Sequence, residues 1–374
     1  MSEPLLVAGL DVGGTKTLAV AIDAAVDPAP QRPGEMGVAG GADGALGGAG
    51  GSGAGTHRED GDGAAHPAVA AAVRRPTGTG GGDRLVASTA GALVALAEAA
   101  GVPVDGFAAV GVGVPGLVDR QAGTVRHAIN LGLDDTPVAL AGHLAALARA
   151  PVVIDNDVNL AAVGAAVALG CRGDLAYLSV GTGLAAGLLL DGRIRRGAHG
   201  AAGEIGHLPV DPHGPVCECG QRGCLEVLAS GAAIAARRPA GGGALTAASD
   251  LLAAAEGGDA AARALVDDVA GHLAGAVALL AQTVDPEVVV LGGGVAEAGP
   301  SLLDAVRRSL RDRAARSPVL AAIALADRVA LVPDGVPAGA IGAALLARHH
   351  LGRTSGPLAS EPPSPAADDV SFGP

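Results

Sequence analysis

Three of the four cysteines in this chain lie close together, as Cys217, Cys219 and Cys224, in a segment that also contains turn-forming glycines. Cysteines at this density in a protein expected to be cytoplasmic favour metal ligation by thiolates over disulfide bonds. A structural zinc site needs four ligands, and His207 is the nearest candidate for the fourth. Free buried thiols or a redox pair are the alternative, and Cys171, in an apolar helix end, is expected to be simply buried. The spacing therefore predicts a structural Zn²⁺ site formed by His207, Cys217, Cys219 and Cys224.

Three glycine-containing turns next to apolar runs could bind the phosphates of a nucleotide. In the first, 11–16 (DVGGTK), consecutive glycines expose backbone N–H groups, Thr15 adds a hydroxyl and Lys16 adds a cation. Asp11 is placed to hold Mg²⁺ directly or through water. An ordinary turn would explain any one of them alone, but three in one chain point to a nucleotide. The candidate residues are Asp11, Gly13, Gly14, Thr15, Lys16, Gly181, Thr182, Gly183, Gly292, Gly293 and Gly294.

The segment 155–159 (DNDVN) clusters polar side chains between an expected strand and an expected helix. In an α/β fold, polar residues at the carboxyl end of a strand commonly line a ligand cleft. The carboxylate of Asp157 could accept a hydroxyl proton during phosphoryl transfer, the role that an aspartate has in kinases. The alternative is structural, because Asn156 or Asp157 could cap the following helix.

Two glutamates, Glu204 and Glu226, bracket the cysteine cluster. A histidine bound to zinc through one ring nitrogen leaves the other nitrogen to orient a substrate hydroxyl. The metal site and polar contacts from Glu204, His207 and Glu226 could therefore share one wall of a site. The alternative is that both glutamates are supporting or surface charges.

Apolar runs separated by glycine turns predict the elements that position these residues. Two strand–turn–strand units, each followed by alternating helices and strands, predict a duplicated α/β architecture with a cleft between two lobes. A helix is expected over 85–100, with Gly101 as its stop signal. The expected strands are 5–10, 17–22, 68–74, 107–114, 151–154, 175–180, 185–190 and 288–291, and the other expected helices are 139–150, 159–169, 259–283, 302–315 and 338–349.

Two segments are expected to lie outside the folded lobes. Residues 24–67 are rich in glycine with scattered acidic residues, so they bury too little apolar surface to offset the entropy of ordering. We expect a flexible insertion there, without chemistry of its own. The tail, 351–374, is rich in Pro, Ser and Asp and is expected to be disordered.

Composition limits the classes of function. With 374 residues, 49% of them hydrophobic, the chain is long enough for two lobes with sizeable cores. A net charge of −13 leaves no basic face for nucleic acid. Its uncharged stretches are too short to span a bilayer, and the N-terminus lacks the basic start of a signal peptide. We expect a cytoplasmic protein that binds neither nucleic acid nor a membrane.

Taken together, these motifs resemble those of the ROK family of sugar kinases and sugar-responsive repressors, within the actin-like ATPase superfamily. The matching segments are 11–16 (DVGGTK), 111–119 (GVGVPGLVD), 155–159 (DNDVN), 179–183 (SVGTG), 197–207 (GAHGAAGEIGH), 217–226 (CECGQRGCLE), 288–296 (VVVLGGGVA) and 338–346 (AGAIGAALL). The resemblance implies two actin-like (ribonuclease H-like) lobes. The smaller lobe would comprise 1–129 and 335–350, and the larger, with the zinc site, 130–334.

The resemblance also implies an ATP- and Mg²⁺-dependent kinase acting on the 6-hydroxyl of a hexose, with Asp157 as catalytic base. Glucose is the first choice, and N-acetylglucosamine and N-acetylmannosamine are alternatives. The positions that match the family's sugar contacts are Asn130, Asn156, Asp157, Glu204, His207 and Glu226. A regulator that binds sugar without turnover is a second hypothesis, although only ten residues precede Asp11, too few for the DNA-binding module of the repressors. A homodimer or homotetramer is expected.

Overall fold

The computed structural model describes residues 5–25, 68–237, 244–296 and 299–354. Most of the predicted insertion, from residue 26 to residue 67, lies outside these ranges, as does the tail from residue 355. Residues 351–354 were predicted to be the disordered start of the tail. This prediction is wrong, because the last helix, α10 (Ala338–Thr354), continues through them.

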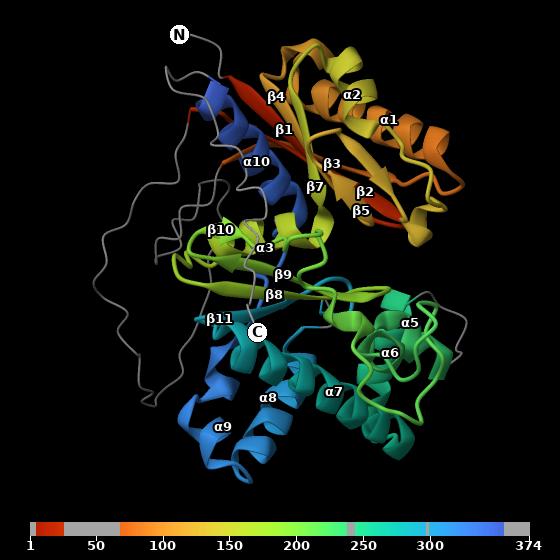
Figure 1. Ribbon diagram of the computed structural model, residues 1–374, viewed down its shortest axis with the longest axis vertical. Coiled ribbons are helices and arrows are strands. Elements are labelled where there is room, and N and C mark those ends of the chain that lie inside the picture. The colour runs from red at the N-terminus through yellow and green to blue at the C-terminus, as the bar shows by residue number, and fades with distance from the viewer. Residues whose placement is uncertain (1–4, 26–67, 238–243, 297–298, 355–374) are drawn as a thin grey trace, which may run out of the picture.

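The first sheet has five strands in the order β3-β2-β1-β4-β7 (Figure 1). The pairings β3–β2 and β2–β1 are antiparallel, and the pairings β1–β4 and β4–β7 are parallel. Helices α1 and α2 contribute to the core on one face, and α10 packs on the other face. The bounds are β1 Leu6–Val12, β2 Lys16–Asp23, β3 Val69–Pro76, α1 Gly82–Ala100, β4 Ala109–Val114, α2 Leu140–Ala148 and β7 Val152–Asn156.

The second sheet repeats this arrangement, in the order β10-β9-β8-β11-β12. The pairings β10–β9 and β9–β8 are antiparallel, and β8–β11 and β11–β12 are parallel, as in the first sheet. The duplicated α/β architecture with two lobes is therefore confirmed. The bounds are β8 Leu175–Val180, β9 Leu184–Leu190, β10 Arg193–Ile194, α6 Ala244–Glu256, α7 Ala260–Val284, β11 Val288–Gly292, α8 Pro300–Ala314 and β12 Val329–Leu331.

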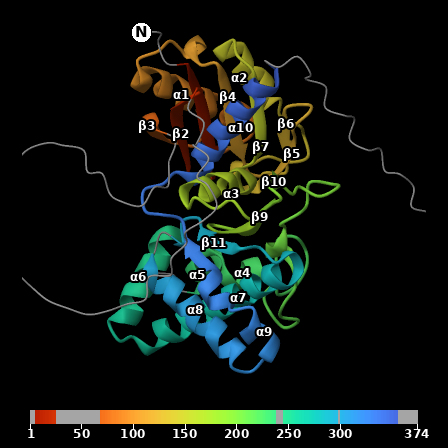
Figure 2. The ribbon, with the colours of Figure 1, turned by 90° about the vertical axis from the view of Figure 1, so that its left-hand side faces the viewer.

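Helix α10 and helix α3 (Asp157–Ala168) lie against one another between the two sheets (Figures 1 and 2). Glycines allow the backbones to come this close. A Cβ atom on Gly111 of β4 would lie 1.8 Å from the carbonyl oxygen of Ala343 in α10, and one on Gly164 of α3 would lie 1.9 Å from that of Ala338. Because no side chain fits at either contact, the two helices join the lobes through tightly packed backbone.

The short elements carry much of the cleft wall. A hairpin, β5 (Leu117–Asp119) and β6 (Thr124–Arg126), follows β4, and single 3₁₀ turns contain Asn130 and His207. Helices α4 (Leu225–Ala229), α5 (Gly231–Arg237) and α9 (Pro318–Ala322) complete the second lobe. None of these was expected from the sequence, because runs of three to seven residues give no clear periodicity.

The structure places the boundary between the lobes later than the predicted position between residues 129 and 130. Strand β7 is the edge strand of the first sheet, paired with β4 from Val110–Val152 to Val114–Asn156. Helix α2 packs in the first core through Leu140 and Leu144. The segment 130–156 therefore belongs with the first sheet, since its pairing and burial connect it there.

Among the described residues, α7 alone has the length and hydropathy of a membrane-spanning helix, and 56% of its most apolar window is buried inside the protein. Val269, Leu273 and Val277 belong to the core of the second lobe. This burial is that of a core helix.

Candidate active site

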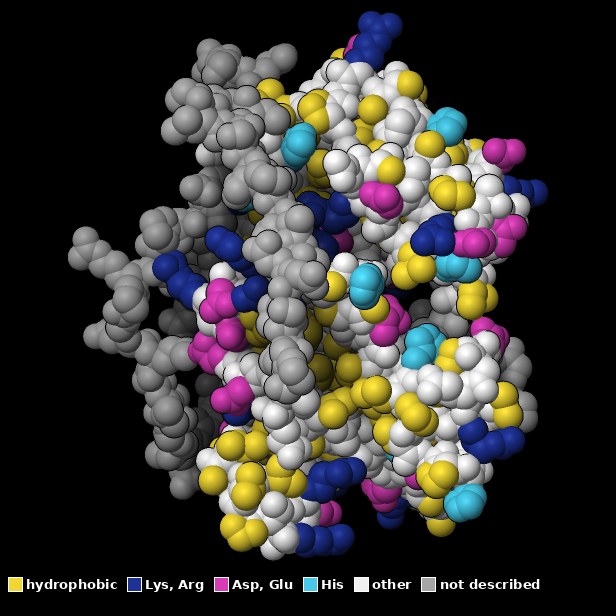
Figure 3. Space-filling view, in the orientation of Figure 1, with side chains coloured by type: hydrophobic (Ala, Val, Ile, Leu, Met, Phe, Trp, Pro, Cys, Tyr) yellow, Lys and Arg dark blue, Asp and Glu magenta, His cyan; other side chains and the backbone are white. Residues whose placement is uncertain are grey.

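A cleft of about 1740 Å³ lies between the lobes, and both contribute to its lining. The molecular surface is hollowed there, with acidic and histidine side chains at the rim (Figure 3). The sequence-predicted residues that line the cleft are Asp11, Gly13, Gly14, Thr15, Lys16, Asn130, Asn156, Asp157, Gly181, Thr182, Gly183, Glu204, His207, Cys219, Glu226, Gly292, Gly293 and Gly294. The two predicted zinc ligands absent from this lining, Cys217 and Cys224, are buried behind it.

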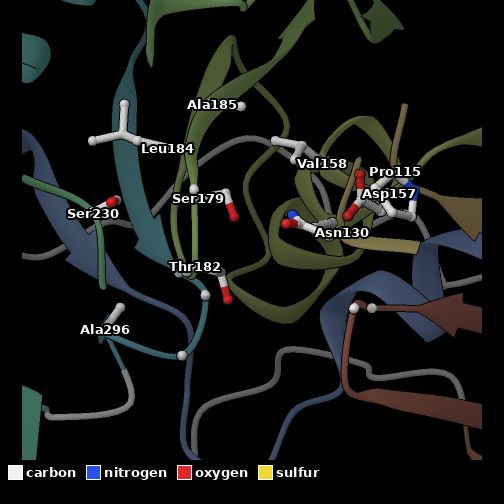
Figure 4. Close-up of a pocket in the computed structure, with 18 of the residues that line it drawn as sticks. Pro115, Asn130, Asp157, Val158, Ser179, Thr182, Leu184, Ala185, Ser230 and Ala296 are labelled. Atoms are coloured by element: carbon white, nitrogen blue, oxygen red, sulfur yellow. The ribbon is translucent and has the colours of Figure 1, made fainter. Parts of the chain in front are cut away.

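Asp157 is the first residue of α3, directly after β7. The side-chain oxygen of Asn156 caps the helix by accepting from the backbone N–H groups of Val158 (3.0 Å) and Asn159 (3.3 Å). Asn156 thus caps the helix as well as lining the cleft, and Asp157 lines the cleft with Asn130, across from the side chains of Ser179 and Thr182 (Figure 4). Burial, with a smaller contribution from the charge of Glu204, raises the pKa of Asp157 to about 6.

Asp11, near the end of β1, is the second acidic group in the cleft. Burial, and next the negative charge of Asp157, raises its pKa to about 7, while the cation of Lys16 opposes this shift. A carboxylate whose ionisation is disfavoured by burial and by a neighbouring negative charge is stabilised by a bound cation, and oxygen donors of this kind suit Mg²⁺. The donor set therefore fits a magnesium ion near Asp11.

Backbone hydrogen bonds hold the glycine turns in tight conformations. The N–H of Gly13 donates to the carbonyl of Lys16 at 2.9 Å, and that of Gly181 to the carbonyl of Gly183 at 3.0 Å. Gly293, after β11, has a φ of +82°, and a Cβ there would lie 2.8 Å from the backbone of Val180. This conformation and contact require glycine, and they bring the second and third turns together at one end of the cleft.

The predicted zinc ligands meet in one cluster. One ligand atom from each of His207, Cys217, Cys219 and Cys224 lies within 4.8 Å of all the others. The Nδ1 of His207 is 3.7 Å from the Sγ of Cys217, and the Sγ atoms of Cys219 and Cys224 are 3.6 Å apart. Zn–S bonds of about 2.3 Å in a tetrahedron put ligand atoms about 3.8 Å apart, so the cluster fits Zn²⁺.

The pKa values of the cysteine thiols are consistent with a bound cation. Burial, followed by the neighbouring thiols, raises the pKa of Cys224 to about 12, whereas a backbone N–H of Gln221 lowers that of Cys219 to about 6. A bound cation would stabilise all three cysteines as thiolates, including the buried Cys224. With Nδ1 directed at the cysteines, the Nε2 of His207 is the ring nitrogen left for the cleft.

Glu226 and Glu204 form the wall between the zinc cluster and the second glycine turn. A carboxylate oxygen of Glu226 accepts from the N–H of Leu184 at 3.0 Å, and a Cβ on Gly183 would lie 2.5 Å from that oxygen. Burial raises the pKa of Glu204, Glu226 raises it further, and His207 lowers it. Glu226 therefore contacts the second glycine turn, and Glu204 interacts with His207 of the zinc cluster.

Several lining residues were not predicted. Ser179 and Tyr177 come from β8, Ser230 lies between α4 and α5, and 331–339 run from the end of β12 through the connection to the start of α10. A serine in an otherwise apolar strand is a signal that could have identified Ser179. The connection carries no comparable signal, because its place in the cleft depends on how distant elements pack.

Comparison with known proteins identifies the family. The ROK family model matches residues 85–350, most of the chain. The chain belongs to the ROK family. A glucokinase from Thermotoga maritima is 34% identical over 259 residues, which are 65% of this chain and 80% of that protein. A glucokinase from Halalkalibacterium halodurans is 33% identical over 217 residues, which are 53% of this chain and slightly under two thirds (65%) of its own length.

Solved structures support the same assignment. A ROK hexokinase from Thermus thermophilus superposes with a TM-score of 0.62 at 30% identity, covering 94% of this chain and 100% of that one. A ROK family glucokinase from Streptomyces griseus, solved in complex with glucose and AMPPNP, gives a TM-score of 0.65 at 25% identity, covering 92% and 99%. A xylose repressor from Caldicellulosiruptor bescii is 42% identical over 131 residues, 34% of this chain and 32% of that protein, so relatives of this ROK protein have more than one kind of function.

Proposed function

We propose that this ROK protein is an ATP-dependent sugar kinase that phosphorylates the 6-hydroxyl of a hexose, with glucose as the first candidate. The observation that carries the proposal is the position of Asp157 in one cleft with three glycine turns and the Glu204–His207–Glu226 wall. The glucokinase relatives and the Streptomyces griseus complex with glucose and an ATP analogue support the same activity.

In this proposal Asp157 is the general base. Asn130, Asn156, Glu204, His207 and Glu226 bind and orient the sugar so that its 6-hydroxyl faces the Asp157 carboxylate. That carboxylate accepts the hydroxyl proton as the oxygen attacks the γ-phosphorus, and ADP leaves.

The glycine turns act on the nucleotide in this scheme. Backbone N–H groups of 11–16 and 181–183 and the cation of Lys16 would contact the phosphates, and 292–294 would contact the adenosine. A magnesium ion held near Asp11 would neutralise phosphate charge. The zinc ion would hold the wall in shape and take no part in the chemical step.

Activity is expected to fall as the pH drops below about 6. Asp157 accepts a proton only when ionised, and burial raises its pKa to about 6. The logarithm of kcat/KM for the sugar should therefore decline toward a slope of one per pH unit on the acid side. A pH profile at fixed ionic strength tests this, and an acid limb centred near pH 4, the range of an ordinary aspartate, would contradict the assignment.

The raised pKa of Asp157 also makes the free energy of unfolding depend on pH, and the direction of this dependence follows from the direction of the shift. Because the folded pKa lies above the ordinary value of 3.8, folding favours the protonated form of Asp157. That contribution is present below about pH 4 and is lost as the pH rises through about 6.

A second candidate is a sugar-binding regulator without turnover, favoured by the similarity to the xylose repressor. N-acetylglucosamine and N-acetylmannosamine are the alternative substrates, and an N-acetylmannosamine kinase from Vibrio vulnificus is 37% identical over 191 residues. A cytoplasmic location and a homodimer or homotetramer remain predictions.

A coupled ADP-release assay against a panel of hexoses and N-acetylhexosamines tests the proposal and ranks the substrates. Sugar-dependent ADP release is expected, largest with glucose. Sugar binding without any ADP release would favour the regulator instead.

A further inference from the structure

An ion-pair cluster surrounds the buried carboxylate of Asp155, two residues before Asp157. The carboxylate of Asp155, 2% exposed, accepts from the Nε of Arg196 at 3.0 Å and from its Nη2 at 2.5 Å. The Nε of Arg120 lies 3.2 Å from the same carboxylate, and the side-chain amide of Asn159 donates to it at 3.4 Å. Asp155 is therefore surrounded by donors, with Arg196 contributing a two-nitrogen contact.

The two sides of this pair come from different lobes. Asp155 lies in β7, at the edge of the first sheet, and Arg120 lies in the hairpin β5–β6 that follows β4. Arg196 follows β10, the edge strand of the second sheet. The contact between Asp155 and Arg196 therefore joins the edges of the two sheets beside the cleft.

Arg196 also begins the segment that carries the proposed sugar-binding wall. From Arg196 the chain runs through three glycines with positive φ to Glu204 and His207. The segment is closed by a hydrogen bond from Ala202 to the carbonyl of Arg196 at 3.0 Å, and it is attached to β9 where Ala186 donates to Gly203 at 2.8 Å. Its far end enters the zinc cluster at His207.

The position of Glu204 relative to Asp157 therefore depends on two anchors. The zinc cluster fixes the far end of the segment, and Arg196 fixes its start against the strand that leads into Asp157. An arginine with two donors on one carboxylate fixes orientation as well as distance, which a single-point contact does not. Breaking the pair would leave the buried Asp155 carboxylate with Arg120 as its one cationic partner among the residues that the structure describes.

We infer that Asp155 and Arg196 are positioning residues, whose ion pair across the lobes sets the distance between the Asp157 carboxylate and the wall that carries Glu204. The inference rests on the proposed sugar kinase function and adds two residues to it. Neither residue touches the reacting atoms in this account. Their effect is on where the sugar is held relative to the base.

The test replaces Arg196 and compares it with its neighbour. Arg196→Gln is expected to lower kcat/KM for the sugar by about 10- to 100-fold, since a displacement of about 1 Å in a reacting pair has effects of this size. The KM for ATP should stay within about threefold of the wild-type value. Arg196→Lys, which keeps the charge but loses the planar fork, should fall between Arg196→Gln and the wild type.

Arg195→Gln is the matched control. Arg195 is the preceding residue, and it pairs with the exposed Asp191 on the surface of the second lobe. Surface pairs of this kind contribute little, so this variant should keep wild-type kinetics for both substrates. Thermal unfolding of all variants, with kcat referred to the folded fraction, separates positioning from loss of folded protein.

Sugar affinity measured by calorimetry without ATP gives a second readout. Weaker sugar binding by Arg196→Gln, with an unchanged KM for ATP, supports the inference. Wild-type sugar KM and kcat in Arg196→Gln, or equal losses for sugar and ATP, would overturn it. If Arg196→Gln does not fold, Arg196→Lys decides by the same two criteria. Failure of the wild type itself to phosphorylate any sugar would instead count against the proposed function, and sugar binding by the variants would still decide the role of Arg196.

Discussion

Replacing Asp157 with alanine is expected to lower kcat for sugar phosphorylation by about 10²- to 10⁴-fold while sugar binding is retained. The variant removes the group that accepts the hydroxyl proton but leaves the glycine turns and the Glu204 wall in place. Because burial disfavours the charged form of Asp157, its removal should not weaken the fold. ADP release and calorimetric sugar binding, measured on the same preparation, test both parts of the expectation.

Asp267→Ala is the control for this experiment. Asp267 is an exposed acidic residue of α7 whose pairing with Arg308 is long, at 3.9 Å, so its removal should change neither kcat nor sugar affinity. Near-normal turnover by Asp157→Ala would show that another group accepts the proton. Loss of sugar binding together with turnover would show that Asp157 holds the sugar rather than activating it.

Loss of the zinc ion is the second change with a large expected effect. Cys224→Ser removes a buried ligand of the four-residue cluster, so the protein should bind less than one zinc per chain and unfold at a lower temperature. The wall residues His207 and Glu226 lie in or next to this cluster, and activity is expected to fall by about 100-fold or more. Elemental analysis, thermal unfolding and the ADP assay measure the three effects.

Cys171→Ser is the matched control, because Cys171 is a free cysteine outside the cluster. It should retain one zinc per chain, the wild-type unfolding temperature and full activity. A Cys224→Ser protein with full zinc content and full activity would contradict the assignment of this site.

The sequence predicted most of the longer elements from local signals, although it missed the thirteen-residue helix α6. The hairpin of β1 and β2 and the hairpin of β8 and β9 follow from apolar runs joined by glycine turns. Helix α1 ends at Gly101, which has the left-handed φ of 69° expected of a glycine stop signal. The short strands β10 and β12 could not be predicted, because two- and three-residue strands are defined by pairing with distant neighbours.

The boundary between the lobes shows the same limit. The residues of β7 carry no local signal that this strand pairs with β4, which lies about forty positions earlier in the chain. The predicted division after residue 129 therefore separated a strand from its own sheet.

The candidate site was largely predictable because its groups lie in compact motifs. Asp157, the glycine turns and the cysteine cluster each carry their chemistry in a few adjacent residues. The pair of Asp155 and Arg196 was not predictable, since the two residues are 41 positions apart and the polar cluster at 155–159 gives no indication that Arg196 is its partner. Only packing of the two lobes brings them together.

The most direct test of the account is to identify the phosphorylated product by ³¹P nuclear magnetic resonance. The wild-type protein with glucose, ATP and Mg²⁺ is predicted to give ADP and a phosphate ester at the 6-position, and 6-deoxyglucose, which lacks the acceptor hydroxyl, is predicted to give no ester. Formation of no sugar phosphate from any sugar that binds, or an ester formed from 6-deoxyglucose, would contradict the placement of the 6-hydroxyl against Asp157.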